Sequence, residues 1–190
     1  MKSDKKKKII ESYNNSSQFY DDRYNLIQRE KFEFGLSQFN YFEKFVLDAG
    51  CGTGLLYEFI SFRENEIHNR FISLDISIKM LKKLKYKQNV LKKKKSISPI
   101  LSDIENIPIR NDIFDSIVSY TSLQNLEDVK KGILELIRVS KSGAEINLSI
   151  LKKDKRIDSL VAFIKPFFND FCRVTNNNLE DTFIKGIVSK

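Results

Sequence analysis

Three glycines within five residues are the strongest sign of a ligand site in this chain. The apolar run Val46-Leu47-Asp48-Ala49 leads into the turn Gly50-Cys51-Gly52-Thr53-Gly54. Glycines in such a turn let the backbone bend sharply and approach a ligand without a Cβ in the way. A helix beginning after the turn would present free N–H groups at the same spot. The third glycine comes one residue earlier than in the dinucleotide pattern G-x-G-x-x-G, so the spacing disfavours a pyrophosphate ligand.

Two carboxylates follow later apolar runs and fit the chemistry of a nucleoside. Asp75 ends the run 71–75, where a carboxylate can accept hydrogen bonds from both hydroxyls of a ribose. Asp103 follows the run 97–101 and can accept a hydrogen bond from an adenine amino group, with Ile104 covering the ring. Together with the glycine turn, these residues predict a nucleoside-containing ligand.

Each of these residues also has a plainer interpretation. Asp48 can be a turn or helix-capping residue, Asp75 a surface residue at a strand end, and Asp103 the N-cap of a short helix. Cys51 is expected to be a small packing residue rather than a nucleophile, because no histidine neighbours it in sequence. His68, the single histidine, lies among polar residues and is expected to be exposed, with no part in catalysis.

The elements expected around these residues alternate between strand and helix. We expect strands at 45–48, 71–75, 97–101, 114–118 and 144–151, and helices at 55–62, 78–84, 127–139 and 157–168. The segment Lys141-Ser142-Gly143 is expected to cap the helix at 127–139. A terminal hairpin is expected to pair 171–174 with 183–188. Alternating strands and helices predict an α/β fold with a mostly parallel sheet and helices on both faces.

Length and composition indicate one domain. The chain has 190 residues, with 41% hydrophobic and 31% charged residues. Residues 1–8 are expected to form a disordered basic tail, and 9–190 a single domain with a helical lead-in at 9–40. The charged N-terminus lacks a signal-peptide core, and no window approaches the ~18 apolar residues of a membrane span. Two distant cysteines indicate no disulfide framework and no metal site, so we expect a cytoplasmic protein without membrane association.

The net charge of +8 raises the question of a polyanionic partner. Much of the excess lies in two runs, Lys5–Lys8 and Lys82–Lys95. Basic chains are attracted to RNA, so RNA is one candidate partner. The alternative is that these lysines form solvated faces, since aromatic residues do not interleave with them as in a stacking platform.

Taken together, the motifs resemble those of class I S-adenosylmethionine-dependent methyltransferases, and most closely the methyltransferase type 11-like group. The family's pattern hhDhGCGTG matches residues 46–54, and its two acidic positions match Asp75 and Asp103. Its polar turn and strand match 112–118, and its helix and turn before the fifth strand resemble 136–143. The resemblance implies a Rossmann-like three-layer sandwich with a mostly parallel seven-stranded sheet, an antiparallel C-terminal hairpin and N-terminal helices.

The resemblance also implies S-adenosyl-L-methionine as cofactor and a role for individual residues. The glycine turn, with Asp48 nearby, would hold the methionine part, and Asp75 the ribose. Ile76, Asp103 and Ile104 would contact the adenine, while Ser119 and Tyr120 would line the floor near the sulfonium. A tyrosine of the lead-in, Tyr20, would close over the cofactor. The cofactor-binding residues predicted in this way are Tyr20, Asp48, Gly50, Cys51, Gly52, Asp75, Ile76, Asp103, Ile104, Ser119 and Tyr120.

The methyl acceptor and a general base are not identified by the sequence. Asp21, Asp22, Tyr20 and Tyr120 are candidate bases only because they are expected near the pocket mouth. The stretch 119–124 lacks the Asn-Pro-Pro-aromatic motif of many enzymes that act on planar nitrogens. Three hypotheses follow: an enzyme acting on RNA or a translation-related protein, with or without a small activator subunit; a small-metabolite methyltransferase; or a non-catalytic module that keeps the cofactor fold.

Overall fold

The computed structural model describes residues 3–37, 45–63, 70–91 and 97–190. Its helices are α1 (Asp4–Ser16), α2 (Tyr20–Gly35), α3 (Leu55–Arg63), α4 (Ile78–Val90), α5 (Val129–Val139) and α6 (Ile157–Ile164), with short 3-10 helices η1 (Leu123–Asn125) and η2 (Lys165–Phe167). Its strands are β1 (Phe45–Ala49), β2 (Arg70–Asp75), β3 (Ile97–Leu101), β4 (Phe114–Ser119), β5 (Ser140–Leu151), β6 (Phe168–Thr175) and β7 (Asp181–Val188).

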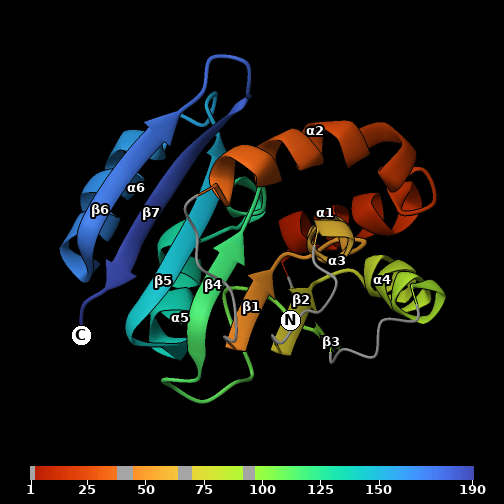
Figure 1. The fold of residues 1–190 in the computed structure, drawn as a ribbon, viewed down its shortest axis with the longest axis horizontal. Coiled ribbons are helices and arrows are strands. Elements are labelled where there is room, and N and C mark those ends of the chain that lie inside the picture. Colours follow the sequence, from red (N-terminus) through yellow and green to blue (C-terminus); the bar gives the residue numbers. More distant parts are fainter. Residues whose placement is uncertain (1–2, 38–44, 64–69, 92–96) are drawn as a thin grey trace.

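All seven strands form one sheet in the order β3-β2-β1-β4-β5-β7-β6 (Figure 1). Strands β1 to β5 pair in parallel, whereas β7 runs antiparallel to both β5 and β6. The predicted Rossmann-like sheet and its antiparallel C-terminal hairpin are therefore confirmed. The strand order reverses beside β1, because β1 lies between β2 and β4. In open α/β sheets the crevice at the carboxyl ends of the strands next to such a reversal is where ligands bind.

Alternating residues of the central strands bury two cores, one on each face of the sheet. On β1, Val46 joins one core while its neighbour Leu47 joins the other; on β7, Phe183 and Ile184 divide in the same way. The first core lies under α2, α3 and α4, and the second under α5 and α6. Because side chains alternate between the faces of a strand, near-continuous apolar runs produce this three-layer arrangement.

The basic N-terminus differs from the expected disordered tail, because residues 4–8 belong to helix α1. The Ser3 hydroxyl caps this helix by accepting a hydrogen bond from the backbone N–H of Lys6, and Asp4 lies in its first turn. Lys6, Ile9 and Tyr13 follow each other at helical spacing, so they share one face. That face lies against the rest of the protein, which explains why a lysine-rich segment is ordered.

Two expected boundaries near the C-terminal half are wrong. Helix α5 ends at Val139, with Ser140 as its C-cap and the first residue of β5, so Gly143 is not a helix cap. Gly143 instead lies within β5 at φ 79°, where the pairing of β5 with β4 shifts register. Glycine adopts this positive φ without steric strain, so it suits an irregular position in a strand. The helix expected at 157–168 ends at Ile164 and continues as η2, and Phe168 already belongs to β6.

Candidate functional site

The glycine turn is built from backbone conformations that only glycine adopts freely. Gly50 and Gly52 have φ angles of 82° and 54°. The N–H of Gly50 donates to the carbonyl oxygen of Leu74 at 2.7 Å, which ties the turn to β2. A Cβ on Gly50 would lie 2.1 Å from Oγ of Ser122, whereas one on Gly52 would meet only Tyr20, at 3.9 Å. Gly50 therefore permits close packing, and Gly52 leaves open space for a ligand.

Asp75 fastens this turn from the end of β2. One carboxylate oxygen accepts from the N–H of Gly52 at 2.9 Å, and the other from the N–H of Ser77 at 2.8 Å. Burial raises the pKa of Asp75, and these backbone hydrogen bonds act in the opposite direction. Each oxygen keeps a lone pair, so the carboxylate can hold the turn and still accept hydrogen bonds from a ligand.

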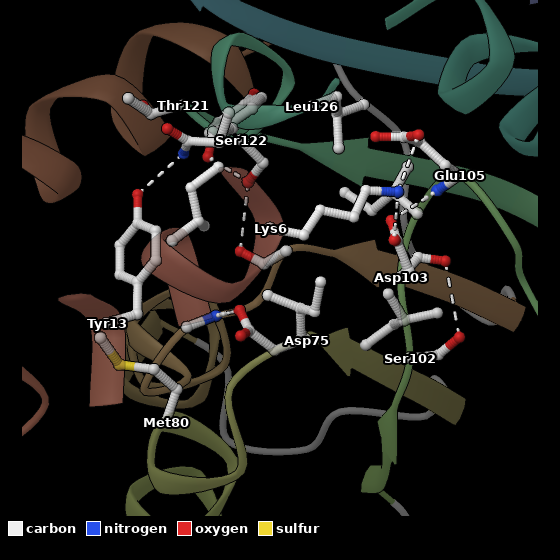
Figure 2. Close-up of a pocket in the computed structure, with 18 of the residues that line it drawn as sticks. Lys6, Tyr13, Asp75, Met80, Ser102, Asp103, Glu105, Thr121, Ser122 and Leu126 are labelled. Carbon is white, nitrogen blue, oxygen red and sulfur yellow. Dashed lines mark hydrogen bonds and ion pairs between the residues drawn. The ribbon is translucent and has the colours of Figure 1, made fainter. Parts of the chain in front are cut away.

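Most of the predicted cofactor-binding residues converge on one pocket at the carboxyl ends of β1 to β4 (Figure 2). Residues of the glycine turn and of the segments that follow β2, β3 and β4 all reach it. The predicted residues lining this pocket are Tyr20, Gly50, Gly52, Asp75, Ile76, Asp103, Ile104 and Tyr120. Residues separated by up to 100 positions thus form one surface, as expected for a parallel sheet.

A second cavity adjoins the first beneath α2. The two share Tyr20, Gly50, Gly52 and Tyr120 in their walls. The other residues lining the second cavity are Gln28, Phe32, Asp48, Cys51, Thr53, Leu55, Leu56 and Val118. This set combines apolar side chains with three polar ones, and Asp48 is its one carboxylate among the described residues.

The buried environment of Asp48 strongly perturbs its pKa. Asp48 is buried, with 5% of its surface exposed. Burial, and secondly the charge of Asp75, raise the pKa of Asp48 to about 8. A cationic ligand group in the adjoining cavity would favour its ionised form. Cys51 is also buried, and burial raises the pKa of its thiol, which supports packing rather than nucleophilic chemistry.

Ser119 does not reach either cavity among the described residues. Its hydroxyl donates to the carbonyl oxygen of Ala49 at 2.8 Å and is fully buried between β4 and β1. Tyr120 does line both cavities, and its ring lies 5.7 Å from that of Phe32 and 5.6 Å from that of Phe183. These two rings fix the tyrosine between α2 and β7.

Asp103 is held in a turn and is also covered by α1. One carboxylate oxygen accepts from the N–H of Glu105 at 2.9 Å, a turn-capping contact related to the plainer interpretation of this residue. The other lies 2.7 Å from Nζ of Lys6, which also contacts Glu105 at 2.8 Å (Figure 2). Asp103 therefore stabilises its own turn, pairs with helix α1 and lines the pocket.

Helix α1 and the segment after Tyr120 contribute residues to the first pocket that were not predicted from the sequence. They are Lys6, Ile9, Tyr13, Thr121, Ser122, Asn125 and Leu126. Tyr13 accepts a hydrogen bond at its hydroxyl from the Asn125 side chain at 2.8 Å, which joins the two segments (Figure 2). The helical spacing of the three α1 residues was a signal for this role, but the lysine run masked it.

The candidate bases have different environments. Asp21 binds the Thr53 hydroxyl and pairs with Lys87 at 2.9 Å, so it braces the glycine turn. Asp22 is exposed. Tyr20 lines both cavities, and burial raises its pKa. His68 lies outside the described residues. Within 3–37, 45–63, 70–91 and 97–190, no metal-binding group and no membrane-spanning helix is found.

Comparison with known proteins gives one family and a consistent set of relatives. The model of the family described as "Methyltransferase domain" matches residues 47–147. A malonyl-[acyl-carrier protein] O-methyltransferase of Hamiltonella defensa is 39% identical over 109 residues, covering 57% of this chain and 38% of the relative. The enzyme of the same description from Buchnera aphidicola is 33% identical over 147 residues, covering 77% of this chain and 55% of the relative.

A solved structure shows the same fold over the whole chain. Magnesium protoporphyrin IX methyltransferase from Synechocystis PCC 6803, with bound S-adenosylmethionine, has a TM-score of 0.75 and 17% identity, covering 99% of each chain. This chain spans only about half the length, or less, of the two curated relatives.

Proposed function

This chain belongs to the methyltransferase domain family, as a class I S-adenosylmethionine-dependent methyltransferase, and from this premise we propose that it methylates a small organic acceptor. The two adjoining cavities carry this proposal. The first has the polar residues that a nucleoside requires. The second is smaller, lies under α2 and combines apolar side chains with the polar side chains of Gln28, Asp48 and Thr53. The shared wall of Tyr20, Gly50, Gly52 and Tyr120 is where the two ligands would meet.

The residues of the first pocket fit the cofactor. Asp75 offers oxygens for ribose hydroxyls, and Ile76 and Ile104 offer apolar contacts for the adenine ring. Asp103 offers an acceptor for the adenine amino group. Gly52 leaves space beside the turn, and the buried Asp48 lies near the position of the cationic end.

For methyl transfer, the main task of the protein is to position the acceptor beside the methyl group. When bound, S-adenosylmethionine supplies a methyl group already activated by its sulfonium. The protein holds the acceptor atom in line with that group, which can remove several kcal/mol of the barrier. Helices α1 and α2 cover the two cavities and limit the access of water. A general base is needed only for an acceptor that must lose a proton, and Tyr20 is the candidate that faces both cavities.

Several lysines of the two runs contact other groups of the protein, which weakens the case for RNA as the acceptor. Lys6 pairs with Asp103 and Glu105, and Lys5 donates to the carbonyl oxygen of Leu126 at 3.0 Å. On α4, Lys87 pairs with Asp21 and with Glu58. The names of the two curated relatives also describe a malonyl group on an acyl-carrier protein as acceptor. Residues 92–95 of the second run lie outside the described residues.

Calorimetry with S-adenosylmethionine, followed by transfer of its labelled methyl group, tests the proposal. We expect binding at one site, and label in a small-molecule acceptor when the protein is incubated with malonyl thioesters and with fractionated cell extract. No binding at millimolar cofactor would exclude the enzyme hypothesis, and binding without transfer would favour the non-catalytic module. If the labelled methyl group were found in RNA alone, the proposal of a small organic acceptor would be wrong. A small activator subunit stays a prediction, which co-purification from the native source would test.

A further inference from the structure

Thr121, directly after β4, has a backbone conformation that threonine rarely adopts. Its φ is 54°, in the left-handed region that favours glycine. A β-branched residue there is strained, and such a conformation persists only when its surroundings impose it. Thr121 lies between Tyr120 and Ser122, and all three line the first pocket. The strain therefore lies in the wall of the site.

Three polar groups of Thr121 are each held by a hydrogen bond from or to another segment. Its N–H donates to Oγ of Ser149 at 2.9 Å, and its hydroxyl donates to a carboxylate oxygen of Asp181 at 2.9 Å. The same hydroxyl accepts from Nζ of Lys31 at 3.0 Å, and its carbonyl accepts from the side chain of Gln124. Ser149 itself donates to Asp181 at 2.6 Å. Thr121 is thus fixed by α2, β5 and β7.

A buried ion pair lies at the centre of this network. Nζ of Lys31 is 2.7 Å from Oδ1 of Asp181, and the two side chains are 3% and 0% exposed. Two charges taken out of water cost much of what their attraction returns, so such a pair is a poor device for stability alone. Because both members of the pair contact the strained Thr121, the pair is suited to hold the backbone of that residue in place.

Ser122, the residue after Thr121, connects this network to the glycine turn. The Ser122 hydroxyl lies 3.1 Å from the carbonyl oxygen of Tyr120 and 3.4 Å from that of Gly50. The absence of a Cβ on Gly50 is what allows this approach. A shift of Thr121 would therefore move both Tyr120, at the junction of the two cavities, and the turn expected to hold the cofactor.

We propose that Lys31, Asp181 and Ser149 are positioning residues that hold the segment Tyr120–Ser122 against the glycine turn in the arrangement required for methyl transfer. This inference rests on the proposed function, because it concerns the same site. It assigns a purpose to a buried charged pair that joins residues 150 positions apart. None of these three side chains lines either cavity among the described residues, so they act through Thr121.

The test compares variants by thermal unfolding, by calorimetry with S-adenosylmethionine, and by the NMR signal of its ¹³C-labelled methyl group when bound. The double variant Lys31→Met with Asp181→Asn removes both charges, so neither is left buried alone. Helix α2 stays attached, because the Asn147 side chain also donates to the carbonyl oxygen of Gly35 at 2.6 Å. Thr121→Gly removes the hydroxyl while keeping the backbone conformation accessible.

We expect both variants to fold, to bind S-adenosylmethionine roughly fivefold to tenfold more weakly, as for the loss of about one hydrogen bond, and to give a shifted or broadened methyl signal. Thr121→Ser, which keeps the hydroxyl, should restore the wild-type signal. The matched control is Arg63→Met with Glu33→Gln, which removes an exposed ion pair of α2 with a distance of 3.0 Å. This control should leave affinity and signal unchanged.

The outcomes separate the two proposals. If wild-type protein binds no S-adenosylmethionine, the proposed function fails. If it binds, and if Thr121→Gly or the double variant keeps wild-type affinity and methyl signal, the network is only structural and the positioning role is wrong. If the surface control reproduces the effects of the double variant, the role is also wrong, because loss of any α2 ion pair would then suffice.

Discussion

Asp75 combines two roles at the scale of a single residue, because its oxygens hold the backbone of the site while facing the pocket. In Asp75→Asn only one oxygen remains, so the N–H of either Gly52 or Ser77 faces an amide NH₂ group. A buried donor without a partner costs about 1–3 kcal/mol. We expect a lower unfolding temperature and an affinity for S-adenosylmethionine weakened by a similar free energy. Thermal unfolding and calorimetry measure the two effects.

The control for this change is Asp112→Asn. The Asp112 side chain is 59% exposed, and its φ of 57° suits asparagine as well as aspartate. We expect both measurements to stay close to wild type. If Asp75→Asn binds the cofactor with unchanged affinity, Asp75 is not a cofactor-binding residue.

Asp48 predicts a pH dependence of stability. Its pKa is raised to about 8 in the folded protein, while an unfolded aspartate titrates near ~4. Between these values the folded state holds a proton that the unfolded chain has released, so stability falls as pH rises from about 4 to 8. The slope from this group is at most about 1.4 kcal/mol per pH unit. Urea unfolding of the ligand-free protein across this range should show the fall.

In Asp48→Asn this contribution to the slope should disappear, because an amide does not titrate. The comparison is made between variant and wild type at each pH, so that other groups cancel. Equal slopes for the two proteins would show that Asp48 is not the buried acid that the structure indicates.

At the scale of elements, we predict that α1 covers the first pocket. The ion pairs of Lys6 hold this helix in place. In Lys6→Met the carboxylates of Asp103 and Glu105 lose a partner that lies within 2.8 Å of each. We expect faster hydrogen exchange of the α1 amides, because local opening becomes easier. Affinity for S-adenosylmethionine should also fall, since Ile9 and Tyr13 line the pocket from the same helix.

Lys7→Met is the matched control. Lys7 is on the same helix, but its side chain is 59% exposed and, within the described part of the chain, its ion pair is with Asp4, three residues away. Exposed pairs of this kind contribute little. The cover hypothesis would be contradicted if both variants exchanged alike or if Lys6→Met exchanged as slowly as wild type.

The elements that local signals determine could be predicted from the sequence. The glycine turn, the strands before Asp75 and Asp103, and the terminal hairpin follow from apolar runs and turn residues a few positions apart. Gly143 was misassigned because a glycine after a helix fits a cap equally well, and only the pairing with β4 shows that it belongs to a strand irregularity. Local patterns cannot distinguish these cases.

The parts of the site that depend on distant contacts could not be predicted. Ser119 was expected in the pocket, yet the parallel pairing of β4 with β1 places its hydroxyl against the carbonyl oxygen of Ala49. The pair of Lys31 and Asp181 joins a helix to a strand far along the chain, and no spacing indicates it. The lysine run at 5–8 is mostly exposed, as one interpretation expected, but its sequence did not indicate that Lys6 pairs with Asp103 and Glu105, because a run of like charges gives no sign of a distant partner.

At the scale of the whole molecule, the site lies between the two cores, so a ligand should stabilise the entire fold. Its residues come from α1, α2 and the ends of four strands of one sheet. At a concentration 100 times its Kd, a ligand that binds only the folded state adds about 2.7 kcal/mol of stability. For a chain of this size each kcal/mol raises the unfolding temperature by roughly 2–4 °C.

S-adenosylmethionine at that concentration should therefore raise the unfolding temperature by about 5–11 °C. NAD at the same concentration is the informative comparison, because the glycine spacing at 50–54 disfavours a pyrophosphate and should leave NAD without effect. Differential scanning fluorimetry measures both. A shift with NAD equal to that with S-adenosylmethionine would show that the pocket recognises only the adenosine that the two share, and that the glycine turn does not select the donor.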